Sequence, residues 1–330
     1  MLRVGSDTWL VLDSGNDHAM YRVSEESGEV LQQVTLSNTT NVDWEAISTD
    51  GIHVYVADVG NNAGARTDLR VYRFPATALT DTASSITVDT IRFQYADQVD
   101  FTPLPDGTNW DCEALLAMDD SLFLFTKNWV DGRTDIYVLP ALPGDHEAVR
   151  RGGFDTQGLI TGASYDPVSE RVALLGYTEL GMEPFVWILS DFAASDLFSG
   201  QHVRHELLTG PLQAEAVVWS AMGEVILANE WSEGHDQALW SVDIPMGSAE
   251  MLPQDPGVLV FPVPADRFVK VDGADPQKGA RIFDLNGALL AAPTLDTTGA
   301  MLLPYLSPGE YVLELTVRSR PTRVPLVITH

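Results

Sequence analysis

The sequence has few of the residues on which several large classes of protein depend. It contains one cysteine, Cys112, among 330 residues, so no disulfide can form within the chain. Its 19 lysines and arginines face 47 aspartates and glutamates, which gives a formal net charge of −28. So acidic a chain repels phosphate backbones, which argues against nucleic acid as a partner. It favours divalent cations, basic partners, or simply solubility in a salty or extracellular setting.

Long apolar runs and common catalytic signatures are missing as well. No stretch reaches the roughly 18 apolar residues that a membrane-spanning helix needs. No G-x-x-x-x-G-K-S/T loop occurs, no dinucleotide fingerprint follows a strand, and Ser14 lies in DSGN rather than in a G-x-S-x-G elbow. The start, MLRVGSDTWLVLDSG, lacks the apolar core and cleavage site of a signal peptide, so we expect it to begin as a strand.

What the chain holds instead is a succession of short apolar runs separated by Gly, Asp, Asn and Pro. Five runs are typical of central β-strands, and each is followed by a strand rich in Tyr or Trp: WLVLDSG, HVYVADVG, SLFLFTKN, RVALLGYT and EVILANE. No segment has a convincing long helical period. Hydrophobic residues make up 45% of the chain, enough for a sizeable core. The predicted fold class is therefore all-β.

An acid placed at the start of an apolar strand recurs along the first part of the chain. The motif reads NVDWEAIS, then NWDCEALL, then more faintly QAEAVVW, and it aligns Glu45, Glu113, Thr161 and Glu215. Their spacing, on the order of 50 to 70 residues, is in the range expected for four-stranded propeller blades. We predict a β-propeller of about five blades over residues 1–252. Its first blade is expected to lack an inner strand, and PATALTDTASSITVDT is expected to be an insertion.

The pattern changes near Pro253. LPQDPGVLVFPVP is rich in proline and glycine, and short alternating runs with close turns follow it. Such runs, separated by regular turns, are typical of a small sandwich of two sheets. We therefore predict a linker at 253–257 and an Ig-like β-sandwich over 258–330.

The last segment resembles a type A sorting domain of the type IX secretion system of Bacteroidota. The resemblance rests on FPVPA, ARIFDLNGALL, LSPGEYVLEL and the terminal RVPLVITH, with the matching residues Phe261, Pro262, Pro264, Ala265, Gly287, Gly309 and Tyr311. Val263 stands where the family has Asn, and His330 ends the chain where Lys or Arg is common. The resemblance implies that the type IX machinery is a partner and that the sandwich directs export. It also implies that the sandwich is usually removed when the cargo is released or anchored at the surface.

The first 250 residues or so resemble the β-propeller proteins often found ahead of such sorting domains. The matching motifs are LDSGN, NVDWEAI, ADVGNNAGARTDLRVYRF, TNWDCEALLAMDDSLFLFTKNW and GLITGAS. This resemblance implies a secreted or outer-membrane surface location and supplies no activity. A more distant likeness runs to phytase-like and paraoxonase-like propellers, which hold calcium near the axis, and it is an analogy of fold alone.

Inner strands line the central channel of a propeller, so the carboxylates of Glu45, Glu113 and Glu215 are expected to converge near its axis. Converging carboxylates repel one another, and burying them unpaired is costly. Three arrangements would resolve this. Calcium, which takes six to eight oxygen ligands, could bind among them. Arg66 or Lys127 could neutralise them, or backbone N–H groups of the next blade could donate to them. We favour the last and keep calcium as the one candidate cofactor.

A second set of candidates lies in the loops that leave the second strand of each blade. Together they would form a polar pocket with an aromatic wall on one face of the propeller: Asp13, Asn16, Asp58, Asn61, Asn62, Arg66, Lys127, Asn128, Trp129 and Glu230. Turn chemistry accounts for many Asp and Asn residues here, but it requires neither a lysine nor a tryptophan. The set suggests a binding module for a glycan or another surface ligand, which we favour. The alternative is a calcium-dependent hydrolase of phosphate esters or lactones.

Overall fold

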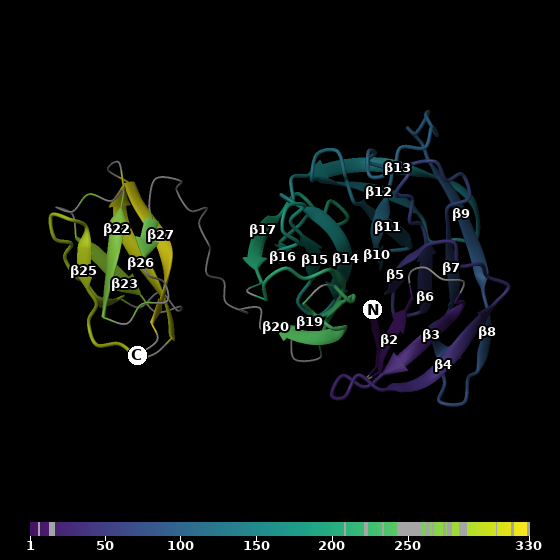
Figure 1. Cartoon of the computed structure of the whole chain (residues 1–330), viewed down its shortest axis with the longest axis horizontal. Helices are drawn as coiled ribbons and strands as arrows, with labels where there is room; N and C mark the ends of the chain where they lie inside the picture. Colours follow the sequence, from purple (N-terminus) through teal and green to yellow (C-terminus); the bar gives the residue numbers. More distant parts are fainter. Residues whose placement is uncertain are drawn as a thin grey trace. The chain divides into compact units, whose positions relative to one another are not determined.

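The protein is described here from a computed structural model. It describes residues 1–5, 7–12, 17–207, 209–220, 224–232, 234–242, 259–261, 265, 267–272, 275, 279–283, 289–307, 309–317 and 320–328. The chain divides into two compact units, Met1–Ile244 and Pro245–His330 (Figure 1). The predicted linker at 253–257 lies outside the described residues. No helix in the described part of the chain is long and apolar enough to cross a membrane.

The first unit is a β-propeller built from successive blades, within which neighbouring strands are antiparallel (Figure 1). Its first two blades contain β1 (Leu2–Val4), β2 (Asp7–Val11), β3 (Ala19–Val23) and β4 (Val30–Ser37), then β5 (Trp44–Thr49), β6 (His53–Asp58), β7 (Arg70–Pro75) and β9 (Asp89–Tyr95). The third contains β10 (Cys112–Met118), β11 (Ser121–Thr126), β12 (Thr134–Pro140) and β13 (Gly144–Phe154). The last two contain β14 (Leu159–Asp166), β15 (Arg171–Tyr177), β16 (Pro184–Ser190) and β17 (Gln201–Glu206), then β18 (Ala214–Trp219), β19 (Val225–Asn229) and β20 (Ala238–Val242).

The inner strands of the five blades form a closed ring. Strand β5 contacts β10, β10 contacts β14, β14 contacts β18, and β1 contacts both β18 and β5. Apolar side chains fill the layers between neighbouring blades because successive residues of a strand point to opposite faces of its sheet. Between the second and third blades, for example, Tyr55, Leu124 and Tyr137 belong to one buried cluster. The predicted all-β propeller of about five blades is confirmed.

The expectation that the first blade lacks its inner strand is wrong. Strand β1 pairs with β2, with Val4 opposite Asp7. The run MLRVGSDTWLV has the apolar pattern of a single strand, but it turns back at Gly5, whose φ of 61° suits a residue without a Cβ. In the fifth blade, the described residues form three strands, β18 to β20.

The stretch predicted as an insertion joins the outer edges of neighbouring blades. It contains the 3-10 turn η1 (Ala76–Ala78) and β8 (Ser85–Thr87), and β8 pairs in parallel with β4 of the first blade. The chain then enters β9, which pairs with β7 of its own blade and in parallel with β13 of the third. Three blades are therefore linked at their outer strands.

The second unit is a sandwich of two sheets. One holds β21 (Leu259–Phe261), β22 (Phe268–Asp272) and β25 (Ala300–Leu302), and the other holds β24 (Leu289–Ala291), β23 (Ala280–Phe283), β26 (Gly309–Val317) and β27 (Arg320–Ile328). Their facing side chains form one core that includes Val269, Ile282 and Leu313. The Ig-like sandwich predicted from the sequence is confirmed as a fold class.

The described residues of the predicted sorting motif have structural contacts within the sandwich. Ala265 is fully buried and forms a parallel bridge with Ile328. Gly309 also pairs with Ile328, and the Tyr311 hydroxyl donates to the carbonyl of Ser307 at 2.7 Å. The backbone of Phe261 pairs with that of Lys270. Pro262, Pro264 and Gly287 lie outside the described residues.

Candidate functional site

The four aligned positions are all sites of a β-bulge in an inner strand. In β5 the register with β6 shifts between Trp44 and Ala46, which leaves Glu45 as the extra residue. The same shift occurs at Glu113 in β10, Thr161 in β14 and Glu215 in β18. A bulge locally turns a side chain away from the regular alternation of the strand. The sequence alignment of these positions is therefore confirmed as a structural equivalence.

Backbone hydrogen bonds bring the loops after the second strands to the same end of the inner strands. The carbonyl of Asp43 accepts from the N–H of Gly60 at 3.2 Å. At the equivalent points, Lys127 N–H donates to the Asp111 carbonyl and Glu230 N–H donates to the Gln213 carbonyl, both at 2.9 Å. The bulged acids and these described loop residues therefore lie at one face of the propeller.

The bulged glutamates lie close enough to act on one another electrostatically. Burial raises the pKa of Glu45 well above its usual range, and the carboxylates of Glu113, Asp43, Asp111 and Glu215 raise it further. No described residue donates a hydrogen bond to the Glu45 side chain. A Cβ on Gly60 would collide with the carboxylates of Asp43 and Glu45. Glycine is therefore the residue that leaves these two side chains their space.

Lys127 is the cation nearest to these acids. Its ammonium lies 3.1 Å from Glu113 Oε1, 4.8 Å from the centre of the Trp129 ring and 5.3 Å from that of Tyr177. Burial lowers the pKa of Lys127, but Glu113, Glu215 and Tyr177 outweigh that effect and hold the pKa above its usual range. Lys127 therefore remains an ammonium, which can stabilise negative charge but cannot serve as a base or a nucleophile.

The carboxylates of Glu113 and Asp111 are held in different ways. Burial raises the pKa of Glu113 well above its usual range, and Lys127 opposes that rise. Asp111 accepts the N–H of Asn61 at 2.7 Å and the indole N–H of Trp129 at 2.9 Å. One of the three arrangements expected for the axial glutamates is therefore present, because a lysine pairs with Glu113. The backbone N–H from the neighbouring blade donates to Asp111, which was not among the predicted axial acids.

Arg66 has other partners than the axial glutamates. Its guanidinium donates to Asp58 Oδ1 at 2.9 Å, to Asp68 at 3.0 Å and to the carbonyl of Gly60 at 2.7 Å. The fully buried Asp58 also lies 3.4 Å from Arg70, because the two residues lie opposite one another in the paired strands β6 and β7. Arg66 therefore neutralises acids in and beside its own loop.

The remaining predicted loop residues differ in exposure. Asn61 is buried, and its Nδ2 donates to the Trp110 carbonyl at 3.2 Å, while Asn62 is exposed. Asn128 is buried and accepts the Thr126 hydroxyl at 2.5 Å. The Glu230 carboxylate accepts from Gln213 at 2.9 Å. Asp13 and Asn16 lie outside the described residues.

Asp43 and Asp111 belong to this site, although the sequence analysis did not select them. Asp43 and Asp111 each stand two residues before a bulged glutamate, so the repeated D-x-E pattern could have identified them from the sequence. Tyr177 ends β15, and only the folded ring places it beside Lys127. The axial cluster is defined here as Asp43, Glu45, Asp111, Glu113, Lys127, Tyr177 and Glu215.

The described residues contain no group of three or more His, Cys, Asp or Glu side chains placed to bind one metal ion. Lys127 supplies a positive charge 3.1 Å from Glu113, where a bound cation would otherwise be needed. Calcium near the axis therefore stays a prediction that awaits measurement.

Comparisons with known proteins bear only on the fold. No protein-family model matches the chain, and no curated protein does. The chain is similar to an exo-β-1,3-galactanase from Phanerochaete chrysosporium, with 11% identity, 96% of this chain and 64% of that chain covered, and a TM-score of 0.39. It is also similar to the hydrazine synthase of Kuenenia stuttgartiensis, with 11% identity, 97% and 92% covered, and a TM-score of 0.35. Likenesses this distant say nothing about the site.

Gly60→Ala should destabilise the propeller, because the added methyl group would push the carboxylates of Asp43 and Glu45 into an already repulsive cluster. We expect a fall in melting temperature measured by circular dichroism. Gly152→Ala is the matched control, since its new methyl would meet only an ordinary contact, 3.8 Å from Phe198. Equal melting temperatures for Gly60→Ala and the unmodified chain would contradict this steric account.

Glu45→Gln should stabilise the protein above neutral pH and leave it nearly unchanged in acid. The folded-state pKa of Glu45 is raised, so its protonation favours folding at low pH, and this contribution is lost as the pH rises through that pKa. Glutamine keeps the shape without the charge. Between pH 4 and pH 8, the melting temperature of Glu45→Gln should exceed that of the unmodified chain by an amount that grows with pH. The two should differ little below the ordinary glutamate pKa of about 4.3. A Glu45→Gln variant that is less stable at pH 8 would show that the charge is compensated, for instance by a bound cation.

Proposed function

We propose that the propeller is a ligand-binding module whose site is the face that bears the axial cluster. The observation that carries the proposal is the gathering of Glu45, Glu113 and Glu215 within electrostatic reach of one another, with one buried lysine paired to Glu113. Like charges so close together cost stability, and strongly perturbed acids cluster at functional sites more often than elsewhere. A purely architectural bulge needs no acid, since Thr161 occupies the equivalent position in the fourth blade and donates to the Ala214 carbonyl at 2.6 Å.

The chemistry of this face favours a glycan. Carboxylate oxygens accept hydrogen bonds from sugar hydroxyls, and a protonated Glu45 could donate one. The half-buried ring of Trp129 offers an apolar surface for the C–H face of a sugar ring. A phosphate ester fits less well, because its negative charge would meet several carboxylates and only one ammonium.

Binding to an array of glycans tests this proposal, with the full chain as the probe. Glu215→Gln should weaken binding about tenfold, as expected when a hydrogen bond to a charged acceptor is lost. Glu26→Gln is the control, because Glu26 is exposed in the β3–β4 loop, which lies at the other end of the strands. If Glu215→Gln binds glycan as tightly as the unmodified chain, the axial face is not the binding site.

We further propose that residues 258–330 act as a sorting domain, so that the protein is cargo of the type IX secretion machinery at the outer membrane or outside the cell. The support is the motif order in the sequence and the sandwich fold of the second unit. The test places the chain behind a Sec signal peptide in a type IX-competent bacterium. The full chain should reach the surface or the medium, whereas a chain ending at residue 257 should stay in the periplasm. Equal export of both would refute the sorting role.

A hydrolase is the second candidate, and one observation favours it. Two buried glutamates with raised pKa values, Glu45 and Glu113, act on one another, and an ammonium able to stabilise an anion lies 3.1 Å from Glu113. Metal analysis of the purified protein and assays with phosphate esters and lactones test it. Stoichiometric calcium, a chelator-induced fall in melting temperature and turnover abolished by Glu113→Gln would establish the enzyme. The absence of turnover would leave the binding module.

A further inference from the structure

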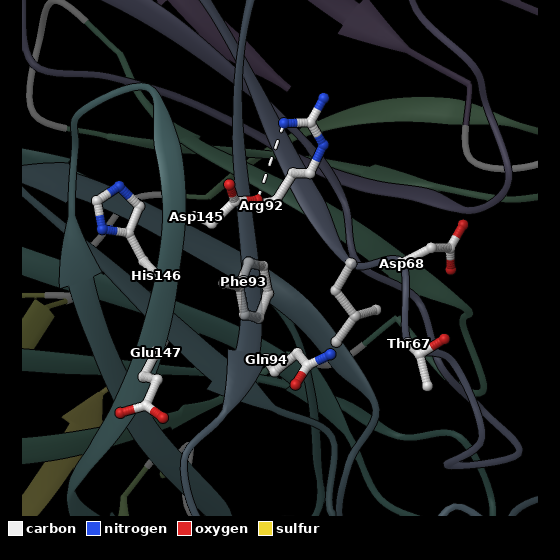
Figure 2. A pocket seen from close by; sticks show the side chains of 9 residues that line it. Thr67, Asp68, Arg92, Phe93, Gln94, Asp145, His146 and Glu147 are labelled. Carbon is white, nitrogen blue, oxygen red and sulfur yellow. Dashed lines mark ion pairs between the residues drawn. The ribbon is translucent and has the colours of Figure 1, made fainter.

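A pocket lies away from the axial cluster, at the junction of the second and third blades. Its volume is about 370 Å³, and three short segments line it: Thr67–Leu69, Arg92–Gln94 and Asp145–Glu147 (Figure 2). The last two segments belong to β9 and β13, the outer strands that pair in parallel. Because this pairing bridges two blades, the pocket has a continuous sheet as its floor instead of a gap between blades.

The strand register sets polar side chains side by side in this pocket. Arg92 lies opposite Asp145, and Gln94 lies opposite Glu147. Residues opposite one another share a face of the sheet, so these four side chains form two adjacent rows on one face. Phe93, which alternates with Arg92 and Gln94, is buried in the core between the blades. Figure 2 shows Arg92 and Asp145 joined across the strands as an ion pair.

These side chains retain most of their hydrogen-bonding capacity. Within the described part of the chain, Thr67, Gln94 and Glu147 have no side-chain hydrogen bond or ion pair. Arg92 and Asp145 share only a long contact of 3.9 Å, and their side chains are 62% and 83% exposed. In the axial cluster, by contrast, Lys127 and Asp111 are already bound to partners within the protein. The outer pocket therefore offers more free donors and acceptors than the axial face.

The composition of the pocket narrows the class of ligand. Asp145 and Glu147 outnumber Arg92, while Asp68 is already paired with Arg66 and Arg70, so the remaining charges of the pocket disfavour an anion. The two apolar residues of its lining, Leu69 and Phe93, are buried, so an apolar ligand would gain little from contact with them. Mixed amide, guanidinium, carboxylate and hydroxyl groups can both donate to and accept from sugar hydroxyls. The volume lies at the low end of the range for small-molecule sites, about 300–1,000 Å³, and suits one or two sugar rings.

We propose that this pocket is a second binding site, for an uncharged mono- or disaccharide. Gln94 and Arg92 donate to the sugar hydroxyls, and Asp145 and Glu147 accept from them. The site is independent of the axial face and does not rest on the function proposed for it. A surface-located protein with two separate sugar sites would hold a polysaccharide more firmly than either site alone.

The experiment titrates the full chain with methyl β-D-galactoside, methyl β-D-glucoside, lactose and cellobiose and follows binding by calorimetry and saturation-transfer NMR. At least one sugar should bind. Gln94→Ala and Glu147→Gln should each weaken that binding at least tenfold and leave the melting temperature unchanged. Gln201→Ala, on the exposed outer strand β17 of the fourth blade, should have no effect.

Three results would overturn the proposal. The first is that none of the four sugars binds at millimolar concentration. The second is that binding survives Gln94→Ala and Glu147→Gln but is lost in Glu215→Gln, which would place the sugar at the axial face. The third is that spermidine binds with an affinity reduced by Glu147→Gln while the sugars do not, which would make the pocket a site for cations.

Discussion

The buried ion pair between Lys127 and Glu113 is the interaction on which the centre of the propeller depends. Its atoms lie 3.1 Å apart, and both side chains are almost fully buried. Four more carboxylates lie nearby, from Asp43, Glu45, Asp111 and Glu215, so one ammonium offsets a large local excess of negative charge. Removing either partner from a buried pair leaves the other uncompensated, which is why such pairs tolerate change poorly.

The same contacts bind the blades to one another. The backbone of Lys127 donates to Asp111, whose carboxylate accepts from Asn61 in the second blade and from Trp129 in its own. Asn61 is in turn fixed by Arg66, whose backbone N–H donates to its side chain at 2.9 Å. The ion pair, the hydrogen bonds of Asp111 and the loop after β6 therefore form one connected polar network, in which satisfied members stabilise each other.

Much of this could be predicted from the sequence, because the features that specify it are local and repeated. Alternating apolar runs predict strands, and an acid recurring in three of the blades predicts equivalent positions at the axis, which the bulges at Glu45, Glu113 and Glu215 confirm. Partners that depend on the folded ring could not be predicted. Arg66 pairs with Asp58 because its loop folds back, and no local sequence pattern predicts this pairing. The parallel pairing of β9 with β13 joins segments distant in sequence, so the pocket above it has no sequence signal.

The most direct test of this account is a thermodynamic cycle of Lys127→Met, Glu113→Gln and the double variant, measured by denaturant unfolding of the full chain at pH 7. Lys127→Met alone should cost about 3–5 kcal/mol, since it leaves buried carboxylates unpaired. The double variant should recover a large part of that loss, with a coupling energy in the upper part of the usual range of about 0.5–3 kcal/mol. Additive effects of the two substitutions would contradict the account and show that Lys127 is not the counter-charge of the axial glutamates.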